Sequence, residues 1–161
     1  MDGDMPRFPA PVEHMLDHAE GVCTAHGGRL TAQRRAVLGL ILQAEGPLGA
    51  YELLDALRRT QPGAAPPTVY RALDFLLAHG LIHKLERLSA YVGCVAGDHA
   101  EGGHAHAAQF LICRGCGRVT EIEDAAVTDA LAAAARRTGF AVARATVEAE
   151  GLCADCNHGS G

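Results

Sequence analysis

Apolar residues recur at steps of three and four positions through the first half of the chain, as they do along the buried face of a helix. The pattern predicts four helices, over residues 11–26, 31–45, 50–59 and 66–79. Thr31 suits the N-cap of the second helix. Pro66 and Pro67 suit the first turn of the fourth, where the missing N–H of proline would be unpaired anyway, and Gly80 ends that helix. Cys23 falls on the apolar face of the first helix and is expected in the core.

Two short strands, over residues 81–86 and 88–92, are predicted to follow the fourth helix. Three helices followed by a two-stranded ribbon describe a winged helix, to which the first helix is an N-terminal addition. We therefore expect residues 1–92 to form a winged-helix DNA-binding domain.

A change of composition separates this domain from the rest of the chain. Residues 93–105 are rich in Gly, Ala, Asp and His, which indicates a hinge or linker. Residues 106–161 are expected to form a second domain. Its predicted elements are strands over 110–113, 119–123 and 140–149 and a helix over 125–137. The expected fold class is α+β.

The composition favours a folded protein outside the membrane. Of 161 residues, 48% are hydrophobic, which is enough for a core. No stretch offers the roughly 18 apolar residues of a membrane helix, and the first twenty residues carry acidic groups rather than an apolar signal segment. We expect a cytoplasmic protein without a membrane partner.

The net charge of −5 for the whole chain disfavours a nucleic-acid partner, but the charge is distributed unevenly among its segments. Residues 27–87 carry eight basic and five acidic groups, whereas 1–26 and 88–161 are each acidic, by −4. A locally basic face is what a phosphate backbone would meet. A balance of +3 also fits an ordinary solvated surface, so charge alone leaves both readings open.

Two pairs of cysteines give the strongest chemical signal. Cys113 and Cys116 are separated by two residues, as are Cys153 and Cys156. This spacing lets all four thiolates reach one tetrahedral zinc ion, at about 2.3 Å each. Such a site has no open position for water or substrate, so its role would be structural. A redox dithiol would leave the second pair unexplained.

A second set of possible ligands mixes nitrogen, sulfur and oxygen donors and could also bind zinc tetrahedrally. It consists of His83, Cys94, His106 and Glu121. Spacing alone does not select these four, because His99 and His104 are equally plausible. The set is distributed over the predicted wing, the hinge and the second domain. A metal held there would clamp the two domains together.

The fourth helix is the natural candidate for reading DNA. Thr68, Tyr70 and Arg71 lie near its N-terminal end, where major-groove contacts are usually made. Arg71 could bind guanine in bidentate fashion or contact a phosphate. Tyr51 and Arg34, near the starts of the preceding helices, would suit contacts to the DNA backbone. Each is, by itself, also an ordinary surface residue.

Three parts of the sequence closely resemble the ferric uptake regulator (Fur) superfamily. They are RLTAQR at 29–34, PPTVYRALDFLL at 66–77 and the two cysteine pairs. Within this superfamily the zinc uptake regulator (Zur) branch is the most similar, and the likeness covers residues from about 12 to 156. The resemblance implies a homodimeric winged-helix repressor whose second domain pairs the subunits. It implies binding to double-stranded operator DNA when metal is bound, and no small-molecule substrate.

The resemblance also implies two Zn²⁺ ions per chain. The four paired cysteines would hold a structural zinc, and His83, Cys94, His106 and Glu121 would form the regulatory site. His106 is preferred to His104 because it lies seven residues before Cys113, as the matching histidine does in zinc regulators.

The identity of the sensed metal depends on Cys94. Iron-sensing relatives favour nitrogen and oxygen ligands, whereas a thiolate is a softer donor that suits zinc. The chain departs from the family by a longer Gly-rich linker between Cys94 and His106, and by a C-terminus soon after the last cysteine pair. These departures leave open a third metal site that involves His99, His104 or His158.

Two rival functions explain the sequence less well. A zinc deaminase would use His99-x-Glu101 with the first cysteine pair, but Ile112 stands where that chemistry expects proline, and the second pair would have no role. A purely structural zinc module would need neither Arg71 nor Tyr70. We therefore expect a non-enzymatic, zinc-responsive repressor of genes for zinc uptake and homeostasis. The alternative is a repressor of the same superfamily that senses another metal such as iron.

Overall fold

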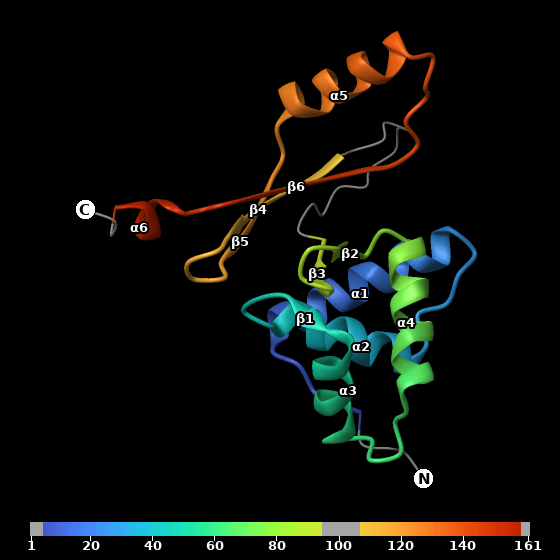
Figure 1. The fold of residues 1–161 in the computed structure, drawn as a ribbon. Helices are drawn as coiled ribbons and strands as arrows, with labels where there is room; N and C mark the ends of the chain where they lie inside the picture. Colours follow the sequence, from blue (N-terminus) through green and yellow to red (C-terminus); the bar gives the residue numbers. More distant parts are fainter. Residues whose placement is uncertain (1–4, 95–106, 159–161) are drawn as a thin grey trace. The chain divides into compact units, whose positions relative to one another are not determined.

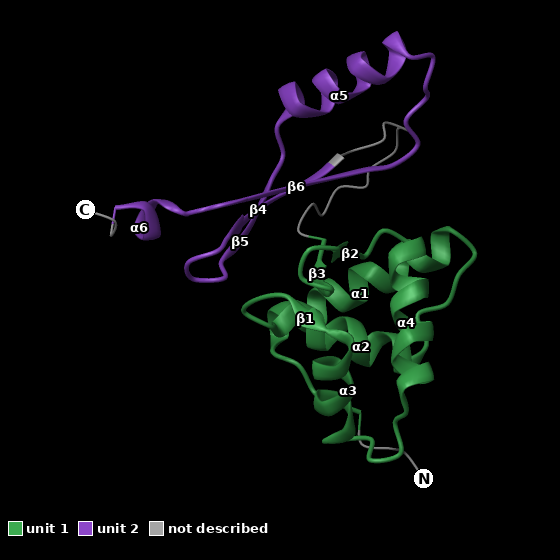
Figure 2. Cartoon of the chain, viewed as in Figure 1, with its two compact units in different colours: residues 1–94 green, residues 95–161 purple. Residues whose placement is uncertain are grey.

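The computed structural model describes residues 5–94 and 107–158 of the chain (Figure 1). The chain divides into two compact units, Met1–Cys94 and Val95–Gly161, called here the first and second units (Figure 2). Helices and two small sheets together confirm the α+β class. Among the described residues, no helix has both the length and the apolar character that a membrane span requires.

The first unit contains the four helices that apolar spacing predicts. They are α1 (Ala10–Ala25), α2 (Ala32–Gln43), α3 (Ala50–Arg58) and α4 (Pro66–Ala78). Thr31 caps α2, because its side-chain oxygen accepts a hydrogen bond from the backbone N–H of Arg34 at 3.4 Å. Gly80 follows α4 with a φ of 68°, in the left-handed region that favours glycine.

A three-stranded antiparallel sheet completes the winged helix. Its strands are β1 (Leu48–Gly49), β2 (Ile82–Leu85) and β3 (Ala90–Gly93), in the order β1-β3-β2. The ribbon of β2 and β3 was predicted, but β1 was not, because a strand of two residues is too short to show alternation. The turn between β2 and β3 contains Ser89, whose φ is 47°.

The core of the first unit is made by the apolar faces of all four helices. Its most buried side chains include Leu16, Cys23, Val37, Leu38, Leu53, Leu57, Leu73 and Leu76. Burial of each leucine contributes about 2 kcal/mol. Cys23 is fully buried, as expected, and burial raises the pKa of its thiol. A buried thiol of this kind is chemically inert.

An ion-pair cluster joins α1 to α2. One guanidinium nitrogen of Arg35 lies 2.7 Å from a carboxylate oxygen of Glu13 and 2.7 Å from one of Asp17. The hydrogen bond from Arg35 lowers the pKa of the Glu13 carboxyl group. The N-terminal helix is thus attached to the winged helix by charge as well as by the buried face of α1.

The second unit consists of a three-stranded sheet and two helices. Its elements are β4 (Ala107–Cys113), β5 (Val119–Ile122), α5 (Ala125–Arg137), β6 (Ala145–Gly151) and α6 (Ala154–Asn157). The strand order is β5-β4-β6, with β4 antiparallel to β5 and parallel to β6. The prediction that the last strand starts at residue 140 is wrong. Pairing with β4 begins only where Ala145 meets Ala107.

A buried glutamine fixes the start of α5 to the sheet. The Gln109 side chain is 2% exposed, and its amide nitrogen donates to the Asp124 carbonyl oxygen at 3.0 Å. Its amide oxygen accepts from the Asp124 backbone N–H at 3.2 Å. Burial of an amide is costly unless its groups are paired, and here both are. This contact orients the β5–α5 connection, which follows Glu121.

Candidate metal centres and nucleic-acid interface

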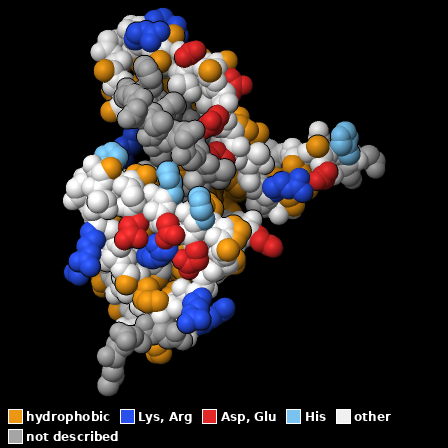
Figure 3. Space-filling model, turned by 180° about the vertical axis from the view of Figure 1, so that it is seen from behind, with side chains coloured by type: hydrophobic (Ala, Val, Ile, Leu, Met, Phe, Trp, Pro, Cys, Tyr) orange, Lys and Arg blue, Asp and Glu red, His pale blue; other side chains and the backbone are white. Residues whose placement is uncertain are grey.

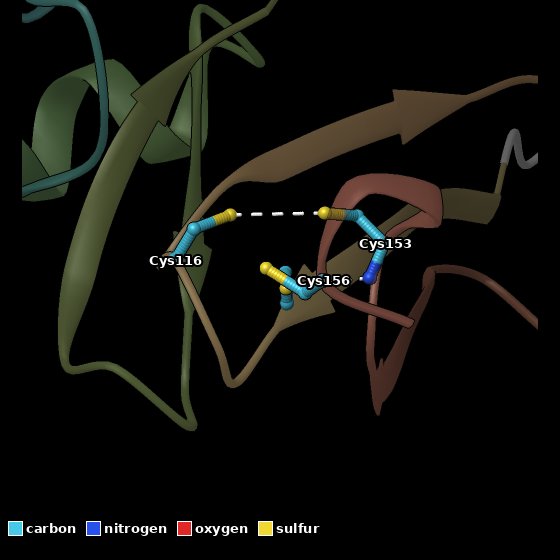
Figure 4. Close-up of side chains that lie close together, drawn as sticks. Cys116, Cys153 and Cys156 are labelled. Carbon is cyan, nitrogen blue, oxygen red and sulfur yellow. Dashed lines mark hydrogen bonds between the residues drawn. The ribbon is translucent and has the colours of Figure 1, made fainter. Parts of the chain in front are cut away.

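The two cysteine pairs meet at one end of the second sheet. Cys113 is the last residue of β4, and Cys153 precedes α6 shortly after β6 ends. Because β4 and β6 are parallel, their ends lie at the same edge of the sheet. All four Sγ atoms lie within 4.8 Å of one another. Figure 4 shows the Sγ atoms of Cys116 and Cys153 facing each other, 3.8 Å apart.

Backbone hydrogen bonds hold both cysteine loops in place. The Gly117 N–H donates to the Cys113 carbonyl oxygen at 2.9 Å, which closes the first loop, and Gly117 has a φ of 75°. The Arg114 N–H donates to the Gly151 carbonyl oxygen at 2.9 Å. This bond continues the β4–β6 pairing past the last strand residue and keeps the two loops adjacent.

The environment of the thiols fits a bound cation. Hydrogen bonds from the backbone N–H groups of Cys153 and Cys116 lower the pKa of Cys113 to about 6. Contacts with the side chains of Cys153, Cys113 and Cys116 instead raise the pKa of Cys156 to about 12. Four adjacent thiolates repel one another, so they need a cation to be ionised together. Zinc meets this need with four sulfur ligands in a tetrahedron.

Gly115 is a supporting residue that sequence reasoning missed. A Cβ atom at this position would lie 2.9 Å from the Cys156 Sγ and 3.1 Å from the Cys156 Cβ. A side chain at residue 115 would therefore displace Cys156 from the cluster. In the sequence, a glycine between two paired cysteines was the only available signal.

Replacing Gly115 by Ala is expected to speed the loss of zinc to the chelator 4-(2-pyridylazo)resorcinol about tenfold, the size typical of residues that support metal ligands. The reason is the displacement of Cys156. Gly151→Ala is the matched control, because a Cβ there meets nothing within 4 Å. Equal release rates for the two variants would contradict the role given to Gly115.

An ion pair also links the two cysteine loops. The Arg118 Nη1 lies 3.0 Å from the Asp155 Oδ2, and Asp155 stands between the cysteines of the second pair. The side chains are 58% and 73% exposed, so solvent screening keeps the contribution of this ion pair to stability small. Opposite charges beside the two pairs were visible in the sequence, but their pairing was not predicted.

The first unit brings together two residues of the second predicted set. His83 lies in β2, where it pairs with Val92, and Cys94 directly follows β3. The Cys94 N–H donates to the Leu81 carbonyl oxygen at 3.1 Å. The ligand atoms of His83 and Cys94 lie within 4.8 Å of each other, and both residues are partly buried.

The other predicted ligands belong to the second unit. Glu121 lies in β5, where it pairs with Phe110 of β4. His106 lies outside the described residues, as do His99 and His104. His158 is exposed at the C-terminal end of α6.

The predicted DNA-reading residues lie on the side of α4 away from the core. Val69 and Leu73 are buried, whereas Tyr70 is 44% exposed and Arg71 is exposed. Thr68, in the first turns of the helix, is partly exposed. The structure thus presents the N-terminal half of α4 to solvent with polar side chains.

Two further predicted residues lie on neighbouring helices. Tyr51 is 74% exposed in the first turn of α3. Arg34 is only partly exposed, because its guanidinium lies over the ring of Phe75. On the face shown in Figure 3, basic, acidic and apolar side chains are interspersed. Charge alone therefore does not mark an interface on that face.

The fold and the cluster define a winged-helix protein with a second unit organised around four converging cysteines. The sequence model of the Ferric uptake regulator family matches residues 25–150. The chain belongs to the ferric uptake regulator family.

The relatives include zinc regulators. The Zinc uptake regulation protein of Escherichia coli (strain K12) is 43% identical over 144 residues, which cover 89% of this chain and 82% of that protein. That of Mycobacterium tuberculosis (strain ATCC 25618 / H37Rv) is 35% identical over 136 residues, or 83% and 98%. A solved zinc uptake regulator complexed with zinc and DNA is 41% identical, with a TM-score of 0.83. The match covers 93% of this chain and 97% of that one.

Proposed function

We propose that this protein is a zinc-responsive transcription repressor that controls genes of zinc uptake and homeostasis. The observation that carries the proposal is the similarity, in both sequence and fold, to a zinc uptake regulator solved with zinc and DNA. The protein is a regulator rather than an enzyme, and a closed four-sulfur site agrees with that. Its operator lies in the cytoplasm, which is therefore its proposed location.

We assign two zinc ions to each chain. Cys113, Cys116, Cys153 and Cys156 hold the structural ion, which ties the end of β6 to the β4–β5 turn. The convergence of their sulfur atoms supports this assignment. His83, Cys94, His106 and Glu121 hold the regulatory ion, and the short distance between the ligand atoms of His83 and Cys94 supports their part in it.

Regulation follows from the distribution of the second ligand set. His83 and Cys94 belong to the first unit, and His106 and Glu121 to the second, so joint ligation restrains one unit relative to the other. Zinc binds the DNA-competent arrangement better than the other one, and it therefore increases the affinity for DNA. DNA must increase the affinity for zinc by the same factor. To shift the ratio of the DNA-competent to the incompetent arrangement from about 1:99 to 99:1, zinc must bind the competent one more tightly by roughly 5.5 kcal/mol.

The DNA-binding surface is proposed to centre on α4. Arg71 and Tyr70 contact base edges or phosphates, Thr68 supports them in the first turns, and Tyr51 contacts the backbone from α3. Arg34 differs from these four, because its guanidinium already lies against Phe75. A homodimer presents two copies of α4, so the operator is an inverted repeat.

A second candidate, an iron-responsive repressor of the same family, is disfavoured by one residue. Cys94 supplies a thiolate beside His83, and sulfur ligands suit zinc better than the nitrogen and oxygen sets typical of iron.

The test combines metal content with DNA binding. We expect two zinc ions per reduced chain by elemental analysis, of which a mild chelator removes one and added zinc restores it. The zinc-loaded protein is first used to select a DNA duplex from a random pool. Binding to this duplex should be lost when the chelator removes that ion and should return when zinc is restored. The affinity should also fall steeply with salt, as phosphate contacts require. A zinc-loaded protein that binds no duplex would refute the proposal.

A further inference from the structure

The Arg34 side chain is engaged inside the first unit. Its guanidinium carbon lies 3.7 Å from the centroid of the Phe75 ring, in cation–π geometry. Its Nη1 donates to the Arg29 carbonyl oxygen at 2.7 Å. Arg34 comes from α2, Phe75 from α4 and Arg29 from the connection between α1 and α2. One side chain thus joins three segments.

The same aromatic ring carries a second partner. The imidazole of His79 is stacked on Phe75, with ring centroids 3.9 Å apart and an angle of 29° between the planes. The His79 Nδ1 also lies 2.9 Å from the Phe75 carbonyl oxygen. Two planar groups this close to one ring centroid cannot share a face, so Arg34 and His79 lie on opposite faces of Phe75.

The His79 end of this stack lies against Gly28. A Cβ atom at residue 28 would lie 2.6 Å from the His79 Nε2. The Gly28 N–H donates to the Cys23 carbonyl oxygen at 2.8 Å, which fixes its backbone at the end of α1. The α1–α2 connection therefore touches both ends of the stack, through Arg29 at Arg34 and through Gly28 at His79.

The stack lies next to the surface that is proposed to read DNA. Phe75 follows Arg71 by four residues, which places the two side chains on neighbouring turns of the same side of α4. Any rotation of α4 about its axis would separate Phe75 from the guanidinium of Arg34. The orientation of Arg71 is therefore coupled to this contact.

We propose that Arg34, Phe75 and His79 form a positioning device that sets the orientation of α4 on DNA. The proposal rests on the DNA-binding function inferred above and assigns Arg34 a role through Phe75 rather than through a phosphate. Lysine would keep the charge of Arg34 but lose its planar stacking surface. Replacing Arg34 by Lys should therefore weaken the stack although it keeps the positive charge.

The test uses the zinc-loaded full chain and two duplexes, the selected operator and a random sequence, over a range of salt concentrations. Arg34→Lys and Phe75→Leu should each lower the ratio of operator affinity to random-sequence affinity about fivefold. The ratio of the double variant should be no lower than that of the more affected single variant, because the effects of coupled residues are not additive. The dependence of affinity on salt should not change. Arg29→Lys is the matched control, since its side chain is exposed and only its backbone carbonyl oxygen meets Arg34.

Several outcomes would overturn the proposal. A phosphate contact by Arg34 predicts that Arg34→Ala reduces the slope of log affinity against log salt by about one, equally on both duplexes. An unchanged affinity ratio in Arg34→Lys would also refute it. His79→Gln, at a partly exposed position outside the buried core, replaces Phe75→Leu if that variant unfolds, and an unchanged ratio there would likewise refute the proposal. If the unaltered protein binds neither duplex, the proposed function itself has failed, and this inference fails with it.

Discussion

Replacing Cys153 by Ser is expected to remove one zinc ion per chain and to unfold the second unit. Within the described part of that unit, the buried residues are only Gln109, Phe110, Ile112 and Cys113. So small a core cannot offset the conformational entropy of the segment without additional stabilisation. Structural zinc supplies about 10–16 kcal/mol of folding free energy in small metal-dependent domains. Its loss should therefore outweigh the stability that this small core provides.

The measurement is elemental analysis of the purified variant together with circular dichroism before and after metal removal. Cys23→Ala is the matched control, because Cys23 is a buried cysteine of the first unit and should not affect zinc content. A Cys153→Ser protein that retains the full zinc content would show that the four-cysteine cluster is not a zinc site.

Replacing Cys94 by Ser is expected to abolish zinc-dependent operator binding while the structural zinc stays in place. A serine hydroxyl does not replace a thiolate as a zinc ligand, so the differential affinity that favours the DNA-competent state is lost. We expect operator affinity in zinc to fall at least about a hundredfold, which corresponds to roughly 2.7 kcal/mol. Titration of a labelled operator duplex with protein, by fluorescence anisotropy at fixed free zinc, measures this directly.

The companion readouts make this prediction specific. The Cys94→Ser protein should hold one zinc ion instead of two and remain folded. In the unaltered protein, more zinc should be needed for binding at lower pH, because the thiol and imidazole ligands must lose protons to bind metal. Zinc-dependent binding that persists in Cys94→Ser would place the regulatory site elsewhere.

Local patterns in the sequence were sufficient for the four helices and the β2–β3 ribbon of the first unit, but not for the two-residue strand β1. The apolar spacing of α1 to α4 reflects their burial on one side, and Thr31 and Gly80 mark boundaries by the hydrogen bond or backbone conformation that each supplies. The four-cysteine cluster was also predictable, because two pairs with a two-residue spacing have few other uses.

Apart from the cysteine cluster, contacts between residues distant in the sequence were not predictable. The sequence predicts a strand from residue 140, but no β4 residue pairs with 140–144, and β6 begins at Ala145. The crowding of Cys156 by residue 115 and the stacking of Arg34 on Phe75 join residues that only the fold brings together. The choice of His106 over its neighbours came from family resemblance rather than from spacing.

The parallel pairing of β4 with β6 has a consequence for the order in which the protein folds. Each β4 residue pairs with one 38 positions later, as Cys113 does with Gly151. The helices of the first unit form through local contacts, whereas parallel strands must first close a long loop, which makes their folding slow. We therefore expect a newly made chain to have a folded first unit before its second sheet assembles. Zinc bound by the four cysteines, as proposed, would then stabilise the product of that late step.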